Sequence, residues 1–361
     1  MAQSVFLTGA TGALGPILAA ELLASGAASR LNVLIRSSDC PASHRFDRWI
    51  ETLESVLAAS GSLLPTPRRR VGLVDGDLCA DHLGLSEAQR DALIEETEVI
   101  IHAAADTNFR GKGQTHWETN VQGTQRLLDL AGRCKRLRKI IFVSTICSAG
   151  IQTGLIREEP ILEKPTFANA YERTKWEAEQ VVLASDLPVE IVRVGIVIGS
   201  SITGAVYRLG AFHHVMKWFG GGQMPVVPGR PDTPVDLIDA ELAAKLIRKA
   251  TTSPSKPGSI YHAAAGKRAV LLGDLFQFSS QQLLDDREYD SSLLGQKEDH
   301  SPAHARLAKA WLPVLLASRT YDTTQAEALW GGPLPLADWR ETLAKMLTFC
   351  GYKESEQASV G

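Results

Sequence analysis

Short apolar runs alternate with longer amphipathic segments through the first 200 residues of the chain. The short runs are rich in β-branched residues and lie at residues 5–7, 31–35, 70–74, 99–102, 139–144 and 189–198. The longer segments repeat with the 3.6-residue period of helices and lie up to about residue 25 and at 45–59, 87–96, 117–132 and 173–183. This βαβα order predicts an α/β fold with a Rossmann-type doubly wound parallel sheet, because strands covered on both faces are apolar nearly throughout.

The regular alternation ends near residue 200. Three glycines at 220–222 and four prolines between 225 and 234 predict a loop-rich region. Beyond it the pattern predicts helices at 239–250, 272–284 and 336–349, a strand at 259–263 and a polar loop at 291–304. We therefore expect a first domain with the doubly wound sheet at 1–200, a smaller second region at 201–352 and a flexible tail at 353–361. A strand from about 232–265 is expected to return to the first sheet.

The composition is that of an ordinary globular protein and excludes several classes of function. Apolar types make up 44% of the 361 residues and the net charge is −3, so no overall field points to nucleic acid or to an anionic membrane. The five cysteines are scattered without a C-x-x-C pair, which argues against a disulfide framework and against a metal site. With no secretory signal pattern and no run of about 18 apolar residues, we expect a cytoplasmic protein without a transmembrane segment.

The first predicted strand runs into a glycine-rich turn, T-G-A-T-G-A-L-G, at residues 8–15. Gly9 permits the tight turn, Gly12 lets the backbone approach a pyrophosphate, and Gly15 lets the next helix pack closely on the sheet. That helix would present free N–H groups and the positive end of its dipole to the phosphates. Its place between a strand and a helix favours a dinucleotide site over a turn without a ligand. The candidate residues are Gly9, Thr11, Gly12, Ala13, Leu14 and Gly15.

Arg36 ends the second predicted strand, at a position that distinguishes NAD from NADP. An acidic side chain there would bind the ribose 2′-hydroxyl, whereas an arginine accommodates a 2′-phosphate. Arg36 therefore favours NADP, with Arg45 as a candidate to assist, and the alternative is a solvated surface arginine. Asp77 follows the third strand, where its carboxylate would accept from the adenine amino group or cap a turn.

Tyr171 and Lys175 lie four residues apart and share one face of a predicted helix. We expect the ammonium to favour the phenolate and so to lower the pKa of Tyr171 from its ordinary value of about 10. Such a tyrosine would serve as a proton donor near neutral pH. The fifth strand ends in Ser144 and Thr145, and a hydroxyl there would hold a carbonyl oxygen beside the tyrosine. A Tyr/Lys pair by itself is common on exposed helix faces. This pair follows a nucleotide-binding turn and a hydroxyl at a strand end, and the three features in this order predict a catalytic site.

As a set, these motifs resemble the extended short-chain dehydrogenases/reductases over roughly the first 200 residues. The matching pieces are residues 8–15, 77–78, H-A-A-A at 102–105, N-V-Q-G-T at 120–124, Ser144 and Thr145 with Gly150, Tyr171 with Lys175, and R-V-G at 193–195. Within that superfamily the chain looks most like the thioester reductases and fatty acyl-CoA reductases. The pieces that carry this closer resemblance are V-L-I-R at 33–36, Phe109, V-S-T at 143–145, residues 171–176, P-V-D at 234–236 and Y-D-T-T at 321–324.

The resemblance implies that Thr145, Tyr171 and Lys175 are the catalytic group and that NADPH is the cofactor. Lys175 would also hold the nicotinamide ribose. The implied cofactor contacts outside the glycine turn are Arg36, Arg45, Asp77, Leu78, Ala103, Ala104, Ala105, Asn120, Val194 and Ile196. The implied reaction reduces an acyl thioester of CoA or of a carrier protein, through a hemithioacetal, to an aldehyde and a free thiol. A second reduction would give an alcohol.

Two other functions stay open on the sequence. The first is an epimerase, dehydratase or ketoreductase of the same superfamily that acts on a sugar nucleotide or a small ketone. Arg36 argues against the sugar-nucleotide enzymes, which usually hold NAD. The second is a non-catalytic NADP-binding sensor, which would have no need of the Thr145, Tyr171 and Lys175 set. We expect an acyl substrate, free or carrier-bound, no nucleic-acid partner, and a monomer or homodimer.

Several other reactive side chains have a plainer interpretation than catalysis. Cys147 is expected to be a small buried hydrophobe rather than a covalent nucleophile. His102 is expected to end a buried strand, and Asn120 to tie down a neighbouring loop. His213 lies on a predicted helix and is expected in the core, with a substrate channel as the alternative. Arg193 is expected either to pair with a carboxylate or to contact a ligand.

Overall fold

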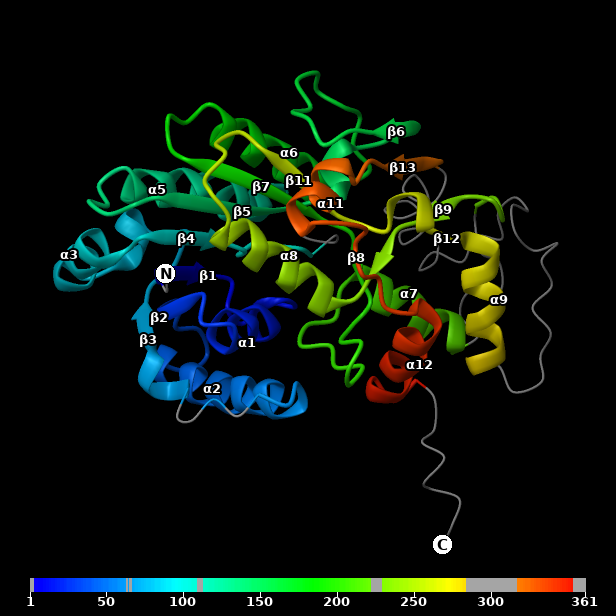
Figure 1. Ribbon diagram of the computed structural model, residues 1–361, viewed down its shortest axis with the longest axis horizontal. Coiled ribbons are helices and arrows are strands. Elements are labelled where there is room, and N and C mark those ends of the chain that lie inside the picture. The colour runs from blue at the N-terminus through cyan, green and yellow to red at the C-terminus, as the bar shows by residue number, and fades with distance from the viewer. Residues whose placement is uncertain are drawn as a thin grey trace, which may run out of the picture.

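The computed structural model has a central parallel sheet of seven strands, in the order β11-β7-β5-β4-β1-β2-β3 (Figure 1). It describes residues 3–62, 64, 67–108, 113–221, 229–283 and 317–352. The strands are β1 (Gln3–Thr8), β2 (Ala28–Ile35), β3 (Val71–Asp75), β4 (Val99–His102), β5 (Lys139–Thr145), β7 (Val189–Val194) and β11 (Ile260–Ala263). The chain winds outward from β1 in both directions, which confirms the predicted doubly wound α/β fold. Phe109, the segment 291–304 and the tail 353–361 lie outside the described residues.

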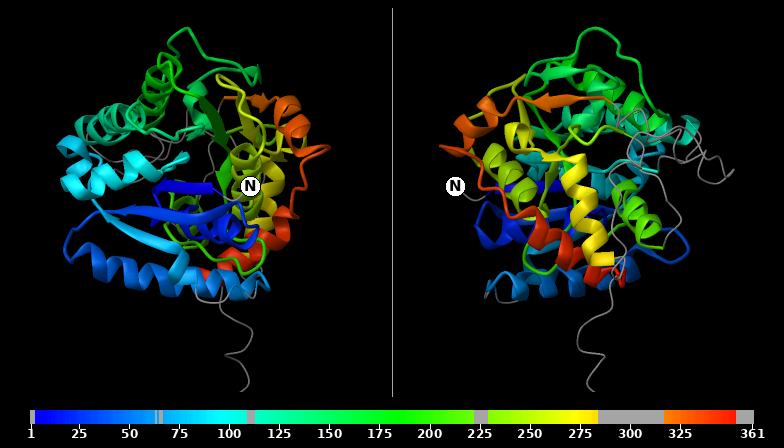
Figure 2. Two further views of the ribbon diagram at one scale, coloured as in Figure 1. Left: turned by 60° about the vertical axis from the view of Figure 1, so that its left-hand side comes forward. Right: turned by 90° about the vertical axis from the view of Figure 1, so that its right-hand side faces the viewer.

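Helices cover both faces of this sheet (Figure 2, left). One face carries α1 (Gly15–Ala24), α2 (Ala42–Ala59) and α8 (Ala240–Thr252), and the other carries α3 (Glu87–Glu96), α5 (Gly123–Ala131) and α6 (Ala170–Leu183). Side chains alternate between the two cores along each strand, so that Val5 and Leu7 join the first core while Phe6 joins the second. Because both faces are covered, the strands are mostly apolar, as the sequence pattern predicted.

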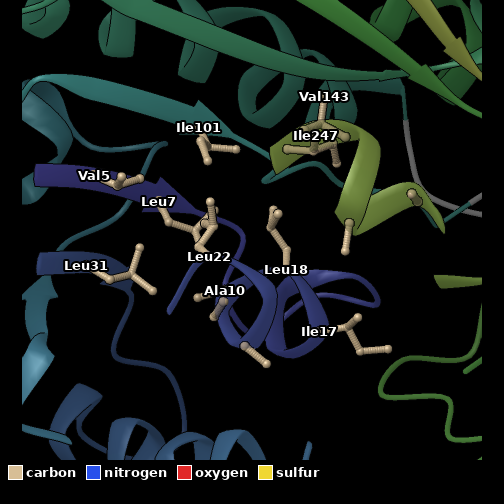
Figure 3. Close-up of a cluster of buried hydrophobic side chains, with 14 of the residues drawn as sticks. Val5, Leu7, Ala10, Ile17, Leu18, Leu22, Leu31, Ile101, Val143 and Ile247 are labelled. Carbon is tan, nitrogen blue, oxygen red and sulfur yellow. The ribbon is translucent and has the colours of Figure 1, made fainter. Parts of the chain in front are cut away.

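The core between β1 and α1 fixes the position of the first helix (Figure 3). Leu18 and Leu22 of α1 and Leu7 of β1 are completely buried. Figure 3 shows Leu22 beside Leu7, and Leu18 pointing toward Ile247 of α8. Burial of each of these side chains stabilises the fold by about 1.5–3 kcal/mol. Helix α1 is therefore held from two sides, by the sheet and by a helix more than 200 residues later in the chain.

A second, smaller core lies at one end of the sheet (Figure 2, right). It is built by α7 (Ala211–Gly220), α9 (Leu272–Leu283) and α12 (Trp339–Phe349). Three short strand pairs lie outside the seven-stranded sheet: β8 (Ile196–Val197) with β10 (Leu237–Ile238), β9 (Pro234–Val235) with β12 (Val270–Leu271), and β6 (Gly154–Ile156) with β13 (Arg319–Tyr321). The remaining elements are α4 (Gly113–Trp117), a π-helical turn (Glu118–Gln122), α11 (Thr324–Trp330) and the 3-10 turns Pro67–Arg70, Asp81–Gly84, Ile146–Ala149 and Gly266–Arg268. None of the described helices is long and apolar enough to cross a membrane.

The structure corrects three predicted elements. Residues 189–198 are not one strand, because Gly195 separates β7 from β8 where the backbone closely approaches Asp236. The predicted helix at 117–132 is interrupted by the π-helical turn before α5. The last helix begins at Trp339 rather than 336, because the Asp338 side chain caps it by accepting from two backbone N–H groups. The short strand pairs and α11 had no counterpart in the sequence pattern.

A buried ion pair ties α8 to the sheet. Lys139 Nζ lies 2.9 Å from Glu190 Oε1, and the two side chains are only 3% and 1% exposed. The same ammonium donates to the carbonyl oxygens of Ala250 and Ser253 at the end of α8. Glu190 in turn accepts from the backbone N–H of Lys256. One cation and one anion thus hold β5, β7 and the end of α8 together.

Replacing Lys139 by Met should lower the free energy of unfolding by about 3–5 kcal/mol, because it leaves a carboxylate buried and unpaired. The matched control is Lys135→Met, which breaks the ion pair with Glu95 at side chains 64% and 57% exposed. That change should cost less than about 1 kcal/mol. Urea unfolding followed by circular dichroism measures both values. Equal losses would contradict a stabilising role for the buried pair.

Candidate active site

A cavity of about 700 Å³ lies along the C-terminal edge of the parallel sheet. The turns that follow β1, β2, β3, β4, β5 and β7 all meet there, since parallel strands end at the same edge. The predicted site residues that line it are Gly9, Thr11, Gly12, Ala13, Leu14, Gly15, Arg36, Arg45, Asp77, Leu78, Ala103, Ala104, Ala105, Thr145, Tyr171, Lys175 and Val194. Asn120 and Ile196 are not among its lining residues. The strand order therefore brings seventeen of the nineteen predicted positions to one cavity.

The glycine turn is packed too closely for larger residues. Gly9 has a φ of +80°, and a Cβ there would lie 2.5 Å from the carbonyl carbon of Ala103 in the turn after β4. A Cβ on Gly15 would clash with the carbonyl oxygen of Ala10. Trp49 of α2 donates from Nε1 to that same oxygen at 2.8 Å. The glycine turn is thus held from outside by the turn after β4 and by α2.

The turn also leaves a cradle suited to a dinucleotide. Gly12 lines the cavity, and the nearest atom to a Cβ built there is the Gly9 carbonyl oxygen, at 3.0 Å. Helix α1 begins at the cavity with no side-chain cap at its N-terminus. Backbone N–H groups at such a terminus bind phosphate oxygens, and the helix dipole favours the negative charge. The residues present therefore fit the pyrophosphate of a nicotinamide dinucleotide.

Two guanidinium groups line one end of the cavity. Arg36 is 61% exposed, and its Nη1 lies 3.9 Å from Asp77 Oδ2. Arg45 Nη1 donates to the carbonyl oxygen of Arg36 at 2.5 Å, which ties the Arg45 guanidinium to the backbone of Arg36. Asp77 also accepts from the backbone N–H of Cys79, so its carboxylate caps the turn after β3. This end of the cavity is positively charged and open to solvent.

The predicted catalytic group is assembled from β5 and α6. Thr145 is the last residue of β5, and its hydroxyl forms a hydrogen bond with that of Tyr171. Helix α6 starts one residue before Tyr171, after an Asn169 side chain that caps it by accepting from the Glu172 backbone N–H. Lys175 Nζ donates to the carbonyl oxygen of Val143 at 2.9 Å. Thr145 of β5 and Tyr171 of α6 therefore contact each other at the cavity wall.

The electrostatics of this group differ from the sequence prediction. Burial raises the pKa of Tyr171 above its ordinary value, and its hydrogen bond to Thr145 opposes only part of that effect. Burial also lowers the pKa of Lys175 to about 8, against the charge of Glu179, which raises it. The expectation that Lys175 lowers the resting pKa of Tyr171 is therefore wrong, because desolvation of the phenol dominates. The phenol is protonated throughout the neutral range.

A fully buried carboxylate joins the two halves of the catalytic group. Glu179 Oε1 accepts from Ser144 Oγ at 2.5 Å and from Ser148 Oγ at 2.9 Å. These serines lie on either side of Thr145 in the chain. Glu179 Oε2 accepts from Arg193 Nη2 at 2.7 Å, so Arg193 has the carboxylate partner that was one of its two predicted roles.

Sequence reasoning missed Glu179, although a signal was present. Tyr171, Lys175 and Glu179 follow one another at intervals of four residues and so share one face of α6. A carboxylate on the catalytic face, one turn after the lysine, has a direct electrostatic effect on that lysine. For the strand-end Ser144, the sequence pattern predicted only a contact with a substrate.

Asn120 and His102 support the site from behind the cavity wall. The Asn120 side chain binds both backbone groups of Asp106, and its Nδ2 also donates to Thr174 Oγ1 at 3.0 Å. It ties the loop after β4 to α6, as predicted. His102 lies between the hydroxyls of Thr8 and Thr124, at 2.7 and 3.0 Å. Burial and the Lys175 charge lower the pKa of His102 to about 3, so this ring is a neutral structural group.

The remaining candidate side chains are structural as well. Burial raises the pKa of Cys147 to about 11, which makes its thiol a poor nucleophile. His213 is buried yet lines the cavity, and both of its ring nitrogens have backbone partners, Gly210 N–H and the Ile198 carbonyl. Ile196 lies in the β8–β10 ladder, where its N–H donates to the Asp236 carbonyl. In the part of the chain that the structure describes, no group of three or more His, Cys, Asp or Glu residues is arranged to hold a metal.

Known proteins resemble this chain over most of its length. Residues 7–247 match the male sterility protein family. A fatty acyl-CoA reductase, wat, from Drosophila melanogaster is 27% identical over 277 residues, which cover 68% of this chain and 53% of that protein. The aldehyde reductase lnaA from Aspergillus flavus is 28% identical over 282 residues, which cover 74% of this chain and 26% of that protein. The chain thus spans about half or less of the length of these relatives.

Solved structures extend the likeness to nearly the whole chain. The terminal R domain from the myxalamid PKS-NRPS biosynthetic pathway aligns with a TM-score of 0.78 and 25% identity, over 97% of this chain and 91% of that one. A thiolation-reductase di-domain from an archaeal non-ribosomal peptide synthetase aligns with a TM-score of 0.70 and 18% identity, over 97% of this chain and 75% of that one. The family match covers residues 7–247, more than half of the chain, and therefore assigns the chain to a family. The chain belongs to the male sterility protein family and is an oxidoreductase of the extended short-chain dehydrogenase/reductase type.

Proposed function

We propose that this chain is an NADPH-dependent reductase of acyl thioesters that releases an aldehyde and a free thiol. The observation that carries the proposal is the meeting of Thr145, Tyr171 and Lys175 in the same cavity as the glycine turn. A proton donor and a dinucleotide cradle in one cavity suit hydride transfer to a carbonyl carbon. The thioester substrate is supported by likeness to a fatty acyl-CoA reductase and to the R domain of a biosynthetic pathway.

The preference for NADPH rests on the two guanidiniums at one end of the cavity. Arg36 and Arg45 both line that end, and the Arg45 guanidinium donates to the backbone carbonyl of Arg36. A 2′-phosphate carries more negative charge than a hydroxyl, and guanidinium forks bind it through charge-assisted hydrogen bonds. Asp77 neutralises Arg36 only partly, because the pair is exposed and 3.9 Å apart.

Each catalytic side chain has a distinct proposed role. A bound NADPH would supply the hydride to the thioester carbonyl carbon. The hydroxyls of Thr145 and Tyr171 hydrogen-bond the carbonyl oxygen, and Tyr171 gives it a proton as negative charge develops there. The phenolate that remains lies one helical turn from the Lys175 ammonium, which stabilises it. Lys175 therefore acts on the deprotonated form of the tyrosine rather than on its resting pKa. The carbon–sulfur bond of the resulting hemithioacetal then breaks, which releases the aldehyde and the thiol.

The direct test is NADPH oxidation, followed by the absorbance of the reduced nicotinamide, with acyl-CoAs, acyl-pantetheine thioesters and aldehydes of the same acyl groups. Thioester-dependent oxidation with one equivalent of released thiol supports the proposal. NADPH oxidation with aldehydes but not with thioesters would contradict the proposed thioester substrate. Turnover with nucleotide sugars or small ketones instead would favour an epimerase, dehydratase or ketoreductase, and tight NADPH binding without any turnover would favour a sensor.

Tyr171→Phe should lower kcat by about 10²–10⁴-fold, because it removes the proton donor from the cavity wall. NADPH affinity, measured by fluorescence titration, should not change, since the phenol is not one of the phosphate-binding groups. The control is Tyr207→Phe, at a half-buried tyrosine packed on the sheet core outside the cavity lining. A Tyr171 variant with the turnover of the wild type would remove the tyrosine from the mechanism.

Arg36→Asp should weaken NADPH binding by about 10- to 100-fold, through loss of a charge-assisted contact with the 2′-phosphate. NADH binding should change far less, because NADH has a hydroxyl at that position. Arg30→Asp, at an exposed arginine on the same strand β2, should leave both affinities unchanged. Equal losses for the two cofactors would place Arg36 outside the phosphate site.

Glu179→Gln should move the basic limb of the kcat–pH profile to lower pH by about one unit. The Glu179 charge raises the pKa of Lys175 and burial lowers it to about 8, so the neutral amide leaves burial unopposed and the ammonium is lost earlier as pH rises. Ser148→Ala removes one hydrogen bond to Glu179 but keeps its charge, and should leave the limb in place. A lower kcat with an unmoved limb would limit Glu179 to a structural role, and thermal melting would check that each variant is folded.

A further inference from the structure

Phe142 is a buried aromatic residue of β5 that contacts the lysine of the catalytic group. Its ring is 1% exposed and belongs to the core between the sheet and α6. Lys175 Nζ lies over this ring, 4.2 Å from its centroid. The same ammonium donates to the carbonyl oxygen of Val143, the next residue of the strand. Two adjacent residues of β5 therefore hold the lysine, one through its ring and the other through its backbone.

The Lys175 ammonium has lost most of its contact with water, since the residue is only 3% exposed. Burial lowers the pKa of Lys175 to about 8, and the charge of Glu179 acts in the opposite direction. The face of an aromatic ring carries negative charge density and attracts a cation within about 6 Å of the centroid. This attraction is strongest where water is excluded. The Phe142 ring thus replaces part of the hydration that burial removes.

The other titratable groups around this ammonium come from α6, β4 and β7. On α6, Glu179 is the carboxylate that acts on it, and the phenol of Tyr171 is protonated. From β4, the His102 ring packs against Phe142 with 5.6 Å between the ring centroids. Burial and then the lysine charge lower the pKa of this histidine to about 3, so it is neutral. From β7, Arg193 shares the charge of Glu179. The ring face is therefore a second source of negative potential, beside a carboxylate that already has a partner.

We propose that Phe142 is a positioning residue of the active site, whose ring face keeps the Lys175 ammonium in its charged form. This inference rests on the proposed function, in which that ammonium stabilises the phenolate left when Tyr171 gives up its proton. Phe142 is not among the residues that line the cavity. It therefore acts on the reaction through the lysine and does not touch the substrate. An aliphatic side chain would occupy much of the same space without offering a negative face to the cation.

The experiment replaces Phe142 by phenylalanines that carry one, two and three ring fluorines. Fluorine withdraws electron density from the ring face and nearly preserves the shape of the side chain. Because the contact stabilises the ammonium, weakening it lowers the pKa of Lys175, and the charge is lost earlier as pH rises. The basic limb of the kcat–pH profile should move to lower pH with each fluorine, by about one unit in total.

A pair of aliphatic variants separates the ring contact from packing. Phe142→Leu removes the ring and should move the basic limb to lower pH. The matched control is Phe6→Leu, at another phenylalanine that is 1% exposed in the same core, on β1 and separated from β5 by β4. It should lower the melting temperature to a similar extent and leave the limb in place. A limb that stays in place through the fluorine series, or that moves equally in the Phe6 variant, overturns the role of Phe142.

A second measurement does not depend on the substrate. Lys175 lines the cavity, so a small reagent can reach its amine. The pH dependence of its acetylation by acetic anhydride, followed by mass spectrometry of the peptide, reports the pKa of Lys175. The midpoint should fall along the fluorine series. A wild type that reduces no thioester fails the proposed function, and the midpoints still decide the role of Phe142. An active wild type with constant midpoints overturns this inference alone.

Discussion

The contact between the turn after β1 and the turn after β4 is the constraint on which the site depends. Gly9 is in van der Waals contact with the backbone of Ala103, and Gly15 with that of Ala10, so no side chain fits at either glycine. This packing brings the N-terminus of α1 to the edge of the sheet, and the buried leucines of α1 hold it there from the other side. A cradle for phosphates results from close packing of the backbone, before any charged side chain contributes.

Desolvation controls the chemistry at the centre of the cavity. The hydroxyl of Tyr171 and the ammonium of Lys175 are both removed from water, and the loss of hydration shifts each pKa toward the neutral form. Glu179 opposes the shift on Lys175, and Arg193 in turn compensates the charge of Glu179. Alternating charges therefore run from Lys175 through Glu179 to Arg193, which is buried in the sheet. This arrangement places a cation one helical turn from a protonated phenol, as the proposed proton donation requires.

Most of the fold was predictable because a doubly covered parallel sheet imposes a strong pattern on the sequence. Six apolar runs predicted the first six strands of the sheet in chain order. The glycine turn after the first run predicted where the dinucleotide would bind. Local packing decided the elements that the pattern missed. Gly195 ends β7 because Asp236, 41 residues later, approaches its backbone. The π-helical turn before α5 carries Asn120, whose side chain holds Asp106. Neither contact has a periodic signature.

The same distinction explains which parts of the site the sequence revealed. Thr145 ends β5, and Tyr171 and Lys175 lie in the first two turns of α6, so the four-residue spacing of the last two translates directly into proximity. The sign of the Tyr171 pKa shift was missed because it depends on how much water the surrounding side chains exclude, which spacing does not report.

Arg208 is placed at the cavity by a different kind of contact. Arg208 lies between regular elements, and its place at the cavity depends on Glu241 and His213, which brace the two ends of its loop. Buried polar groups on the cavity wall bind partners within the fold, so replacing them lowers the stability of the protein. An exposed guanidinium on a braced loop carries no such penalty. The proposed catalytic group is therefore built into the sheet and α6, whereas an exposed residue such as Arg208 can change without loss of stability.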